Sequence, residues 1–216
     1  MKHFTCFFFF VFTCVYAGAQ SYVERDIKTF GAKGDGKTND HEAFEKAAAF
    51  FNERGGRGKL IISKGTYIVG KQTYTAGKNG LPAFKGFDVL HFEKVKDLAI
   101  EGKAGAMLKY AGGFRYGAFN PQTKKAHNSL RDFYDYTYAA FLGHCIYIAE
   151  SENISVKNIE LNGNSQTFIL GGKYGDVGRQ LQHYGLFIAD GKSIKIENVN
   201  AHHFEALDVA AVPPED

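Results

Sequence analysis

Apolar residues recur at two different periods along the chain, first helical and then β. The helical stretch predicts one amphipathic helix with a single buried face. Its apolar positions are Ala43, Phe44, Ala47, Ala48 and Phe51. Asn39 and Glu42 stand three residues apart just before them, which predicts a capping box, and Gly55-Gly56 predicts the end of the helix. Two short runs follow, at 60–63 and 66–69, and predict strands.

Three later segments superimpose without gaps and predict a repeating β architecture. In each, an apolar residue is followed six positions later by a second and two positions further by a third. Alternation by two is typical of a short strand with one buried face, and the polar interval between marks a turn. The segments are 92–100, 148–156 and 188–196, so their starts lie 56 and 40 residues apart. Since a β-helix coil needs about 20–30 residues, we expect inserted loops at 111–143 and 163–183.

Asn158 and Asn198 stand at equivalent places in the second and third segments, directly after a strand. If the coils stack at about 4.8 Å, the two amides can hydrogen-bond to each other as a ladder. The alternative is that they are unrelated turn residues. Residues 204–212 predict the strand of a further coil, yet a solenoid needs a cap over its last coil and none follows. We therefore expect the chain to be the N-terminal portion of a longer, truncated β-helix.

The first nineteen residues have the pattern of a secretory signal. Lys2 precedes an apolar run from Phe4 to Tyr16, and Ala17-Gly18-Ala19 provides a small-residue cleavage site. A membrane span would need about 20 apolar residues, more than this run contains. We expect an exported protein that is secreted, periplasmic or at the cell surface, without stable membrane insertion. Residues 1–19 would be the signal, and 20–216 would form one incomplete β-helix domain.

The charge and the cysteine content further narrow the classes of protein to which this chain could belong. The chain has 26 Lys and Arg against 23 Asp and Glu, and residues 1–19 contain one of these lysines and no acid. This near balance is unlike a nucleic-acid-binding domain, so no nucleic-acid partner is expected. Two of the three cysteines lie in the signal, which leaves Cys145 without an intrachain disulfide partner. Cys145 precedes Ile146, and we predict that it is a buried strand residue.

The segment from Phe30 to Asp40, FGAKGDGKTND, resembles the N-terminal signature of the pectate lyase superfamily. Lys64-Gly65-Thr66-Tyr67 is similar to the strand motif that follows it in that superfamily. The group includes polygalacturonases, rhamnogalacturonases, epimerase-like proteins and phage tailspikes. The resemblance implies an all-β fold, a right-handed parallel β-helix (solenoid) with an N-terminal capping helix and a groove for an extended polysaccharide. Gly31, Gly34 and Gly36 would permit tight positive-φ turns.

The resemblance also implies a polysaccharide lyase or glycoside hydrolase that acts on acidic, pectin-like glycans. The alternative is a non-catalytic glycan-binding or adhesive β-helix of the tailspike kind. Hydrolysis needs two carboxyl groups, about 6.5–9.5 Å apart for inversion. Elimination instead needs a base near the proton beside a uronate carboxylate, and a cation or arginine that neutralises the carboxylate. The paired-acid motifs of pectin hydrolases do not occur in this sequence.

The richest group of polar residues lies on and after the second predicted insert. The candidate catalytic residues are Asp176, Arg179, His183 and His203, and the candidate substrate-binding residues are Tyr116, Gln182, His202 and Asp208. In this hypothesis a histidine acts as the base, Arg179 holds a carboxylate, and Asp176 or Asp208 orients a histidine. Alternatively, Arg179 and Asp176 form a loop salt bridge, and the histidines cap turns.

Two further features have competing interpretations. Glu150 and Asp190 are equivalent in the alignment, so they could together bind Ca²⁺, and no other cofactor is implied. The interpretation that we favour is that both are solvated turn residues and that Lys94 neutralises Glu150. His144 has no partners at metal-ligand spacing, so no zinc site is expected. The aromatic residues of the first insert either stack on sugar rings or cover an edge of the β-helix.

Overall fold

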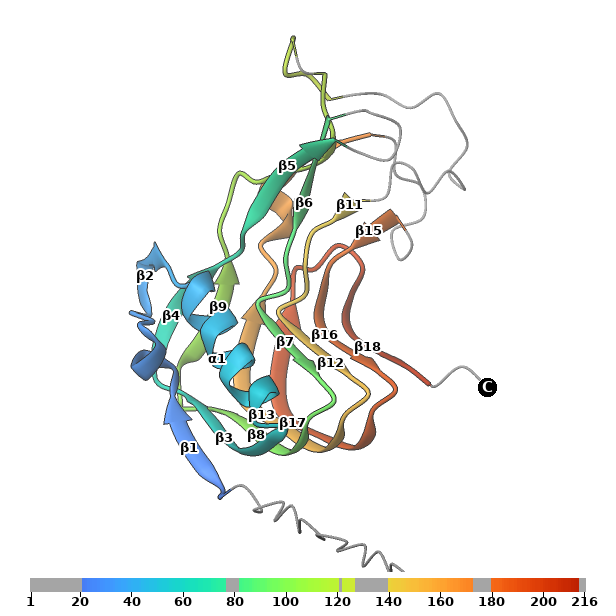
Figure 1. The fold of residues 1–216 in the computed structure, drawn as a ribbon. Coiled ribbons are helices and arrows are strands. Elements are labelled where there is room, and N and C mark those ends of the chain that lie inside the picture. The colour runs from blue at the N-terminus through green and yellow to red at the C-terminus, as the bar shows by residue number, and fades with distance from the viewer. Residues whose placement is uncertain (1–20, 77–81, 121, 127–139, 173–179, 214–216) are drawn as a thin grey trace, which may run out of the picture.

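The computed structural model describes residues 21–76, 82–120, 122–126, 140–172 and 180–213 (Figure 1). Within them the chain folds as a parallel β-helix with one α-helix, α1 (His41–Glu53), beside its N-terminal end. The strands are β1 (Val23–Asp26), β2 (Asp35–Asn39), β3 (Gly56–Ile62), β4 (Gly65–Val69), β5 (Gln72–Ala76), β6 (Pro82–Gly86), β7 (Leu90–Glu93), β8 (Lys96–Gly102), β9 (Ala106–Tyr110), β10 (Arg115–Ala118), β11 (Ala140–Phe141), β12 (Ile146–Ala149), β13 (Glu152–Asn162), β14 (Ile169–Gly171), β15 (Leu181–Gln182), β16 (Tyr184–Ala189), β17 (Lys192–His202) and β18 (Leu207–Val212), with 3₁₀ turns η1 (Ile27–Phe30) and η3 (Ser165–Thr167).

Two parallel sheets form the walls of the coils. The first contains β1, β3, β8, β13 and β17 in one half, and β13 continues into a second half with β9, β4 and β2. The other wall contains β7, β12, β16 and β18 in that order, which lie side by side in Figure 1. Each coil therefore passes from one wall to the other and returns one strand further along the axis.

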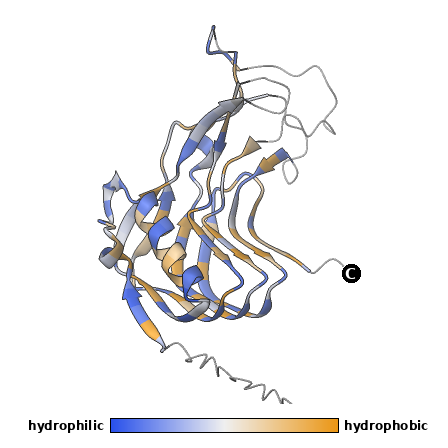
Figure 2. Ribbon diagram, viewed as in Figure 1, coloured by the Kyte–Doolittle hydropathy of each residue, from blue (hydrophilic) through white to orange (hydrophobic). Residues whose placement is uncertain are grey.

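The predicted gapless stacking of the three segments is confirmed. Ile148 pairs with Phe92 on one side and with Ile188 on the other. Val156 likewise lies between Ile100 and Ile196. Phe92, Ile148, Ile100 and Val156 are fully buried. Figure 2 shows hydrophobic segments recurring along β7, β12, β16 and β18, as expected when alternate side chains form a shared internal column.

The turn between the two walls repeats the same backbone on successive coils. Six non-glycine residues in it have left-handed φ angles between 45° and 56°. They are Lys94, Glu150 and Asp190 at one position and Asp97, Asn153 and Ser193 three residues later. Asn and Asp adopt this conformation more readily than most residues. Asn153 Nδ2 also donates to Asp97 Oδ1 on the neighbouring coil at 2.6 Å, which holds the two turns in register.

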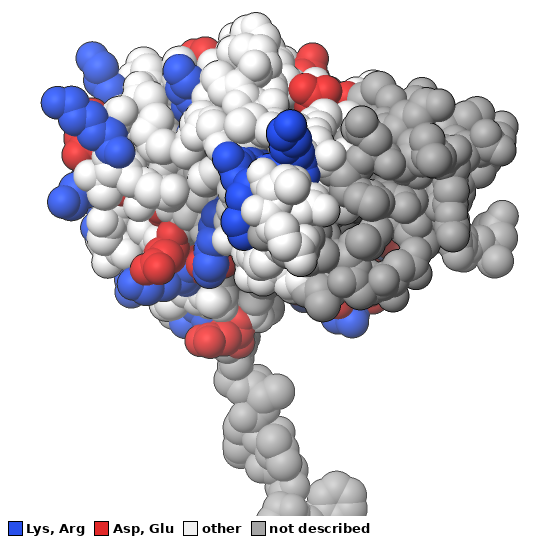
Figure 3. All heavy atoms as spheres, turned by 90° about the horizontal axis from the view of Figure 1, so that it is seen from above, with Lys and Arg blue, Asp and Glu red and all other residues white. Residues whose placement is uncertain are grey.

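Opposite charges alternate between coils along the outer surface of β8, β13 and β17. Lys96 Nζ lies 2.9 Å from Glu152, which lies 3.7 Å from Lys192 on the next coil. Glu101 similarly lies between Lys59 and Lys157. Exposed pairs of this kind contribute little to stability, because solvent screens them. On the face seen in Figure 3, charges of both signs are interspersed over the described part of the surface.

The predicted asparagine ladder is confirmed. Asn198 Nδ2 donates to Asn158 Oδ1 at 3.0 Å, and both residues have left-handed φ angles. On the preceding coil the equivalent position is Gly102, where an added Cβ would lie 2.1 Å from the carbonyl oxygen of Asn158. Only glycine therefore fits between these two coils.

Gly102→Ala is expected to lower the free energy of unfolding by about 1–3 kcal/mol, because an extra carbon in a closely packed site forces the coils apart. Gly112→Ala is the control, since its nearest contact would be the Thr167 side chain at 3.2 Å rather than backbone. Denaturant unfolding followed by circular dichroism measures both. Equal losses for the two variants would contradict the close approach at Gly102.

Helix α1 forms as predicted, but the full capping box does not, because the helix begins at His41 and Asn39 Oδ1 accepts from the N–H of His41 at 3.0 Å rather than from that of Glu42. The residues predicted for its buried face are all buried. Its N-cap is Asp40, which makes no side-chain capping bond. The Asp40 carboxylate instead accepts hydrogen bonds from the backbone N–H groups of Lys33 at 2.8 Å and Gly34 at 2.9 Å. The glycine-rich turn, whose Gly31, Gly34 and Gly36 have positive φ as expected, thus orients this carboxylate away from the helix.

The two predicted inserts pair with each other and form a separate lobe. Strand β10 pairs with β14, and β11 pairs with β15. An antiparallel hairpin of β5 and β6, which the sequence pattern did not indicate, adds to β10. Within this lobe Tyr116 is fully buried in an apolar cluster with Ala140, Leu142 and Leu181, and Phe119 is 4% exposed and packs against Phe84. Phe133 lies outside the described residues.

Two other features bear on the sequence predictions. Cys145 is buried and unbonded as expected, although strand β12 begins one residue after it. Burial raises the pKa of its thiol far above the ordinary value, so Cys145 stays protonated. Among the described residues, no helix has the length and apolar character needed to cross a membrane.

Candidate functional site

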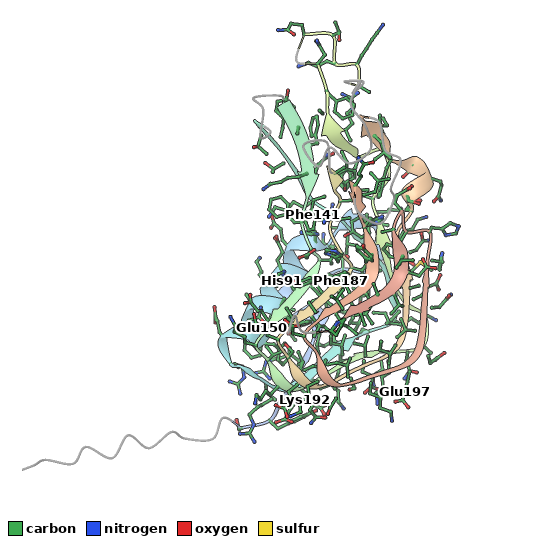
Figure 4. All side chains as sticks on the ribbon, turned by 90° about the vertical axis from the view of Figure 1, so that its right-hand side faces the viewer. His91, Phe141, Glu150, Phe187, Lys192 and Glu197 are labelled. Atoms are coloured by element: carbon green, nitrogen blue, oxygen red, sulfur yellow. The ribbon has the colours of Figure 1, made fainter. Side chains whose placement is uncertain are left out.

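Two columns of polar and aromatic side chains cross the wall formed by β7, β12 and β16. The first column is Asp88, His144 and Tyr184, and the second is His91, Tyr147 and Phe187. Both columns repeat at the intervals of 56 and 40 residues at which these strands pair, so their members come from successive coils. With Phe141 and Gln182 they line a depression of about 400 Å³. Figure 4 shows His91 and Phe187 at one level of the stack, with Phe141 above them.

Asp88 is the centre of this depression. Its Oδ1 accepts from His144 Nδ1 at 2.5 Å and from the backbone N–H of His144 at 3.0 Å. Its Oδ2 contacts His91 Nδ1 at 2.8 Å. Burial alone would raise the pKa of Asp88, but the hydrogen bonds from His144 and His91 outweigh burial and hold the pKa well below its ordinary value. Asp88 is therefore a carboxylate that anchors two imidazoles.

The bond to Asp88 determines which nitrogen of His144 is available for chemistry. Because the carboxylate only accepts hydrogen bonds, Nδ1 carries a proton, and in the neutral imidazole the lone pair therefore lies on Nε2. The His144 side chain is only 7% exposed. Four aromatic rings surround it, at centroid distances of 5.2–5.4 Å: Phe141, Tyr147, Tyr184 and Phe187. This is an oriented, largely dehydrated imidazole of the kind that serves as a general base.

The backbone around Gly143 positions His144 beside Asp88. Gly143 has a φ of 91°, and an added Cβ there would lie 2.0 Å from the carbonyl oxygen of Phe87. The neighbouring coils also bond directly here, since the N–H of Val89 donates to the carbonyl of His144 at 2.8 Å. Glycine thus permits the close approach that brings the carboxylate and the imidazole into contact.

His91 differs from His144 in exposure and in charge. Its side chain is 46% exposed, and its ring lies 4.6 Å from that of Tyr147. The hydrogen bond to Asp88 raises the pKa of His91 above its ordinary value. Burial raises the pKa of the Tyr147 hydroxyl, which therefore remains protonated at neutral pH. The depression thus contains a base, a proton donor and a group that becomes cationic as pH falls.

The candidate site residues that we predicted from the sequence do not gather in one place, as far as the structure describes them. Asp176 and Arg179 lie outside the described residues, so their roles stay predictions. Gln182 is exposed and lines the depression. Asp208 and His203 are exposed on the last coil, and His202 Nε2 contacts Glu160 at 3.1 Å. Tyr116 is fully buried and cannot reach a ligand in this arrangement. Of the six that the structure describes, only Gln182 lines the depression.

His183 is a core residue in this structure. It is 0% exposed, and the rings of Tyr110, Phe168 and Phe204 lie 4.7–5.2 Å from it. Burial lowers the pKa of His183 from 6.5 to about 3, with a smaller contribution from His144. The imidazole is therefore uncharged at neutral pH, and its position suits packing better than proton transfer to a solvent-accessible substrate.

The buried His183 makes stability depend on pH. Between its ordinary pKa of 6.5 and its folded value of about 3, the unfolded chain binds a proton that the folded chain does not. Stability is therefore expected to fall as the pH is lowered through this window. His183→Phe should flatten the dependence. Denaturant unfolding at several pH values compares the slopes, and an unchanged slope in the variant would contradict a buried, neutral His183.

No metal centre is present among the residues that the structure describes. They contain no group of three or more His, Cys, Asp and Glu side chains that could hold an ion. Glu150 lies 3.6 Å from Lys94, as in the interpretation of a neutralised turn residue. A larger depression of about 440 Å³ lies at the asparagine ladder, but the imidazole–carboxylate pair makes the smaller one the candidate active site.

Two solved structures are similar to this chain in fold, both A-modules of mannuronan C-5 epimerases from Azotobacter vinelandii. The AlgE6 module matches 88% of this chain with a TM-score of 0.48 and 17% sequence identity. The AlgE4 module matches 88% with a TM-score of 0.40 and 19% identity. The chain spans 39% and 52% of the lengths of these two proteins. Neither a protein-family profile nor a curated protein sequence matches it.

Proposed function

We propose that this chain acts on an acidic polysaccharide by removing the proton beside a uronate carboxylate. The observation that carries the proposal is the pairing of His144 Nδ1 with Asp88 at 2.5 Å in a depression lined by aromatic rings. A base held in one tautomer and shielded from water suits abstraction of a proton from carbon, which is slow without an oriented acceptor.

In elimination, His144 Nε2 takes the proton, and the electron pair left on carbon forms a double bond. The bond from the neighbouring ring carbon to the glycosidic oxygen breaks, and that oxygen takes a proton from the Tyr147 hydroxyl. Asp88 stabilises the imidazolium that forms, as a carboxylate does for the base of a hydrolytic triad. His91, once protonated, adds positive charge beside the uronate carboxylate.

Hydrolysis by two carboxyl groups is less well supported. Asp88 is the only carboxylate among the described residues that line this depression, and both of its oxygens bind histidines. A nucleophilic or base-acting carboxylate needs a free oxygen directed at the sugar. We therefore favour proton abstraction over the hydrolase alternative.

A second candidate function is binding of a glycan without catalysis. Tyr147 and Phe187 stack with a centroid distance of 5.7 Å and an interplanar angle of 5°. Two nearly parallel rings on successive coils form an apolar column that a sugar can contact, whether or not a reaction follows. The pattern of residues 1–19 supports export to a compartment that contains such glycans.

Incubation with polyuronates of plant and algal origin distinguishes these functions. Elimination would increase ultraviolet absorbance, because it creates a conjugated double bond. Hydrolysis would release reducing ends without that absorbance, and binding alone would retard the protein in a gel that contains the polysaccharide. Absence of all three effects on every acidic polymer would contradict the proposal.

A further inference from the structure

A second depression adjoins the candidate active site on the side of helix α1. Its volume is about 330 Å³, and it shares Asp88, His91 and Phe141 with the first depression. The first extends over β7, β12 and β16, whereas the second extends from β7 onto the helix. Together they form one groove that crosses the coils along the axis of the β-helix.

The walls of this second depression suit a sugar ring. Ala48 and Ala49 of α1 give it a floor of small side chains, and Phe87 and Phe141 add aromatic surface. Lys71 is not one of the lining residues, but its Nζ lies 5.2 Å from the centre of the Phe87 ring and 3.1 Å from Glu45, and both of these residues line the depression. The Lys71 side chain is 45% exposed, and an ammonium has three donors, so it can bind a second carboxylate beside that of Glu45.

The helix that carries these residues is fixed to the adjacent strand. Asn52 Nδ2 donates to the carbonyl of His91 at 2.8 Å, and Asn52 Oδ1 accepts from the N–H of Glu93 at 3.2 Å. The Asn52 side chain thus hydrogen-bonds to the backbone at the edge of β7, as a further strand would. Because α1 and β7 are bonded in this way, the second depression is preformed, which reduces the entropic cost of binding.

We propose that the substrate groove continues past Asp88 onto α1, and that the second depression binds a further sugar of the same acidic chain. In this arrangement Lys71 contacts the carboxylate of that sugar, and Ala49 leaves room for its ring. The inference rests on the proposed function and deepens it, because it predicts a preference for long acidic chains over short ones.

The test measures the dissociation constants of short and long oligouronates of defined length by isothermal titration calorimetry. The native chain is expected to bind the long oligomer about tenfold more tightly or better, equivalent to about 1.4 kcal/mol. Ala49→Trp fills the depression and should remove this advantage, so that the long oligomer binds no more tightly than the short one. Lys71→Gln should weaken binding of the long oligomer alone, by several-fold.

Matched controls on exposed sites separate these effects from general damage. Ala104→Trp adds the same bulk at an exposed alanine, and Lys46→Gln removes an exposed lysine of α1 outside the depression. Both should retain the preference for long chains. A preference that survives Ala49→Trp, or that is absent from the native chain, would overturn the inference.

A parallel assay of unsaturated products keeps the two proposals distinguishable. If the native chain processes short and long oligomers equally, the subsite on α1 is wrong and the proposed function stands. If it neither binds nor processes any oligouronate, the proposed function fails and the subsite fails with it.

Discussion

His144→Gln is expected to lower the rate of reaction on an acidic polysaccharide by about 10²–10⁴-fold, the usual contribution of a positioned general base. Glutamine can still hydrogen-bond to Asp88, but its amide has no basic nitrogen to replace Nε2. Because the aromatic rings around the site stay in place, affinity for the polymer should change little. Turnover at saturating substrate, measured beside the dissociation constant, separates the two effects.

His203→Gln discriminates between our two assignments of the base. The sequence makes His203 a candidate base, but it is exposed on the last described coil and does not line the depression around Asp88. The structure therefore predicts full activity for this variant. Loss of activity in His203→Gln together with normal activity in His144→Gln would contradict the candidate site and favour the assignment made from sequence.

Ile148→Ala is expected to cost about 2–5 kcal/mol of unfolding free energy, the range for deleting a large aliphatic side chain from a core. Ile148 is fully buried, and it lies between Phe92 and Ile188 on the neighbouring coils. The cavity would open in the middle of the stack, where the coils on both sides limit collapse. Chemical denaturation of the native chain and the variant gives the difference.

Ile196→Ala provides the matched control for this loss. Ile196 stands in the same kind of column on β17, but it is 39% exposed because the coil that contains it is the last of its sheet in the described chain. Less apolar surface leaves the core, so the expected cost is about 1 kcal/mol or less. Similar losses at the two positions would contradict the stacking that defines the fold.

The sequence predicted the stacked coils because their apolar positions repeat without gaps. Ile148, Phe92 and Ile188 pair in the register that the alignment required, and Asn158 and Asn198 form the expected ladder. These contacts repeat one pattern on successive coils. The spacing of that pattern in the sequence therefore determines their register. The capping box of Asn39 and Glu42 did not form because the helix begins at His41, whose N–H donates to Asn39 Oδ1, and helical spacing does not locate the first helical residue that closely.

The candidate site was not predicted, although a signal for it was present. Extending the three aligned segments by only four residues toward the N-terminus superimposes Asp88, His144 and Tyr184. The second insert has the richer group of polar residues, and loops often carry function. Polarity alone does not reveal that His183 is enclosed by aromatic rings, whereas burial in the structure does. The β5–β6 hairpin also escaped prediction, since it departs from the parallel repeat.

Incubation of an acidic polysaccharide with the protein in deuterated water tests the central claim most directly. If Asp88 and His144 remove the proton beside the uronate carboxylate, the polymer should gain either unsaturated ends or deuterium at that carbon, detected by nuclear magnetic resonance and mass spectrometry. His144→Gln should abolish both signals while it remains folded. Cleavage that yields only saturated ends without deuterium, or signals unchanged in the variant, would contradict the account.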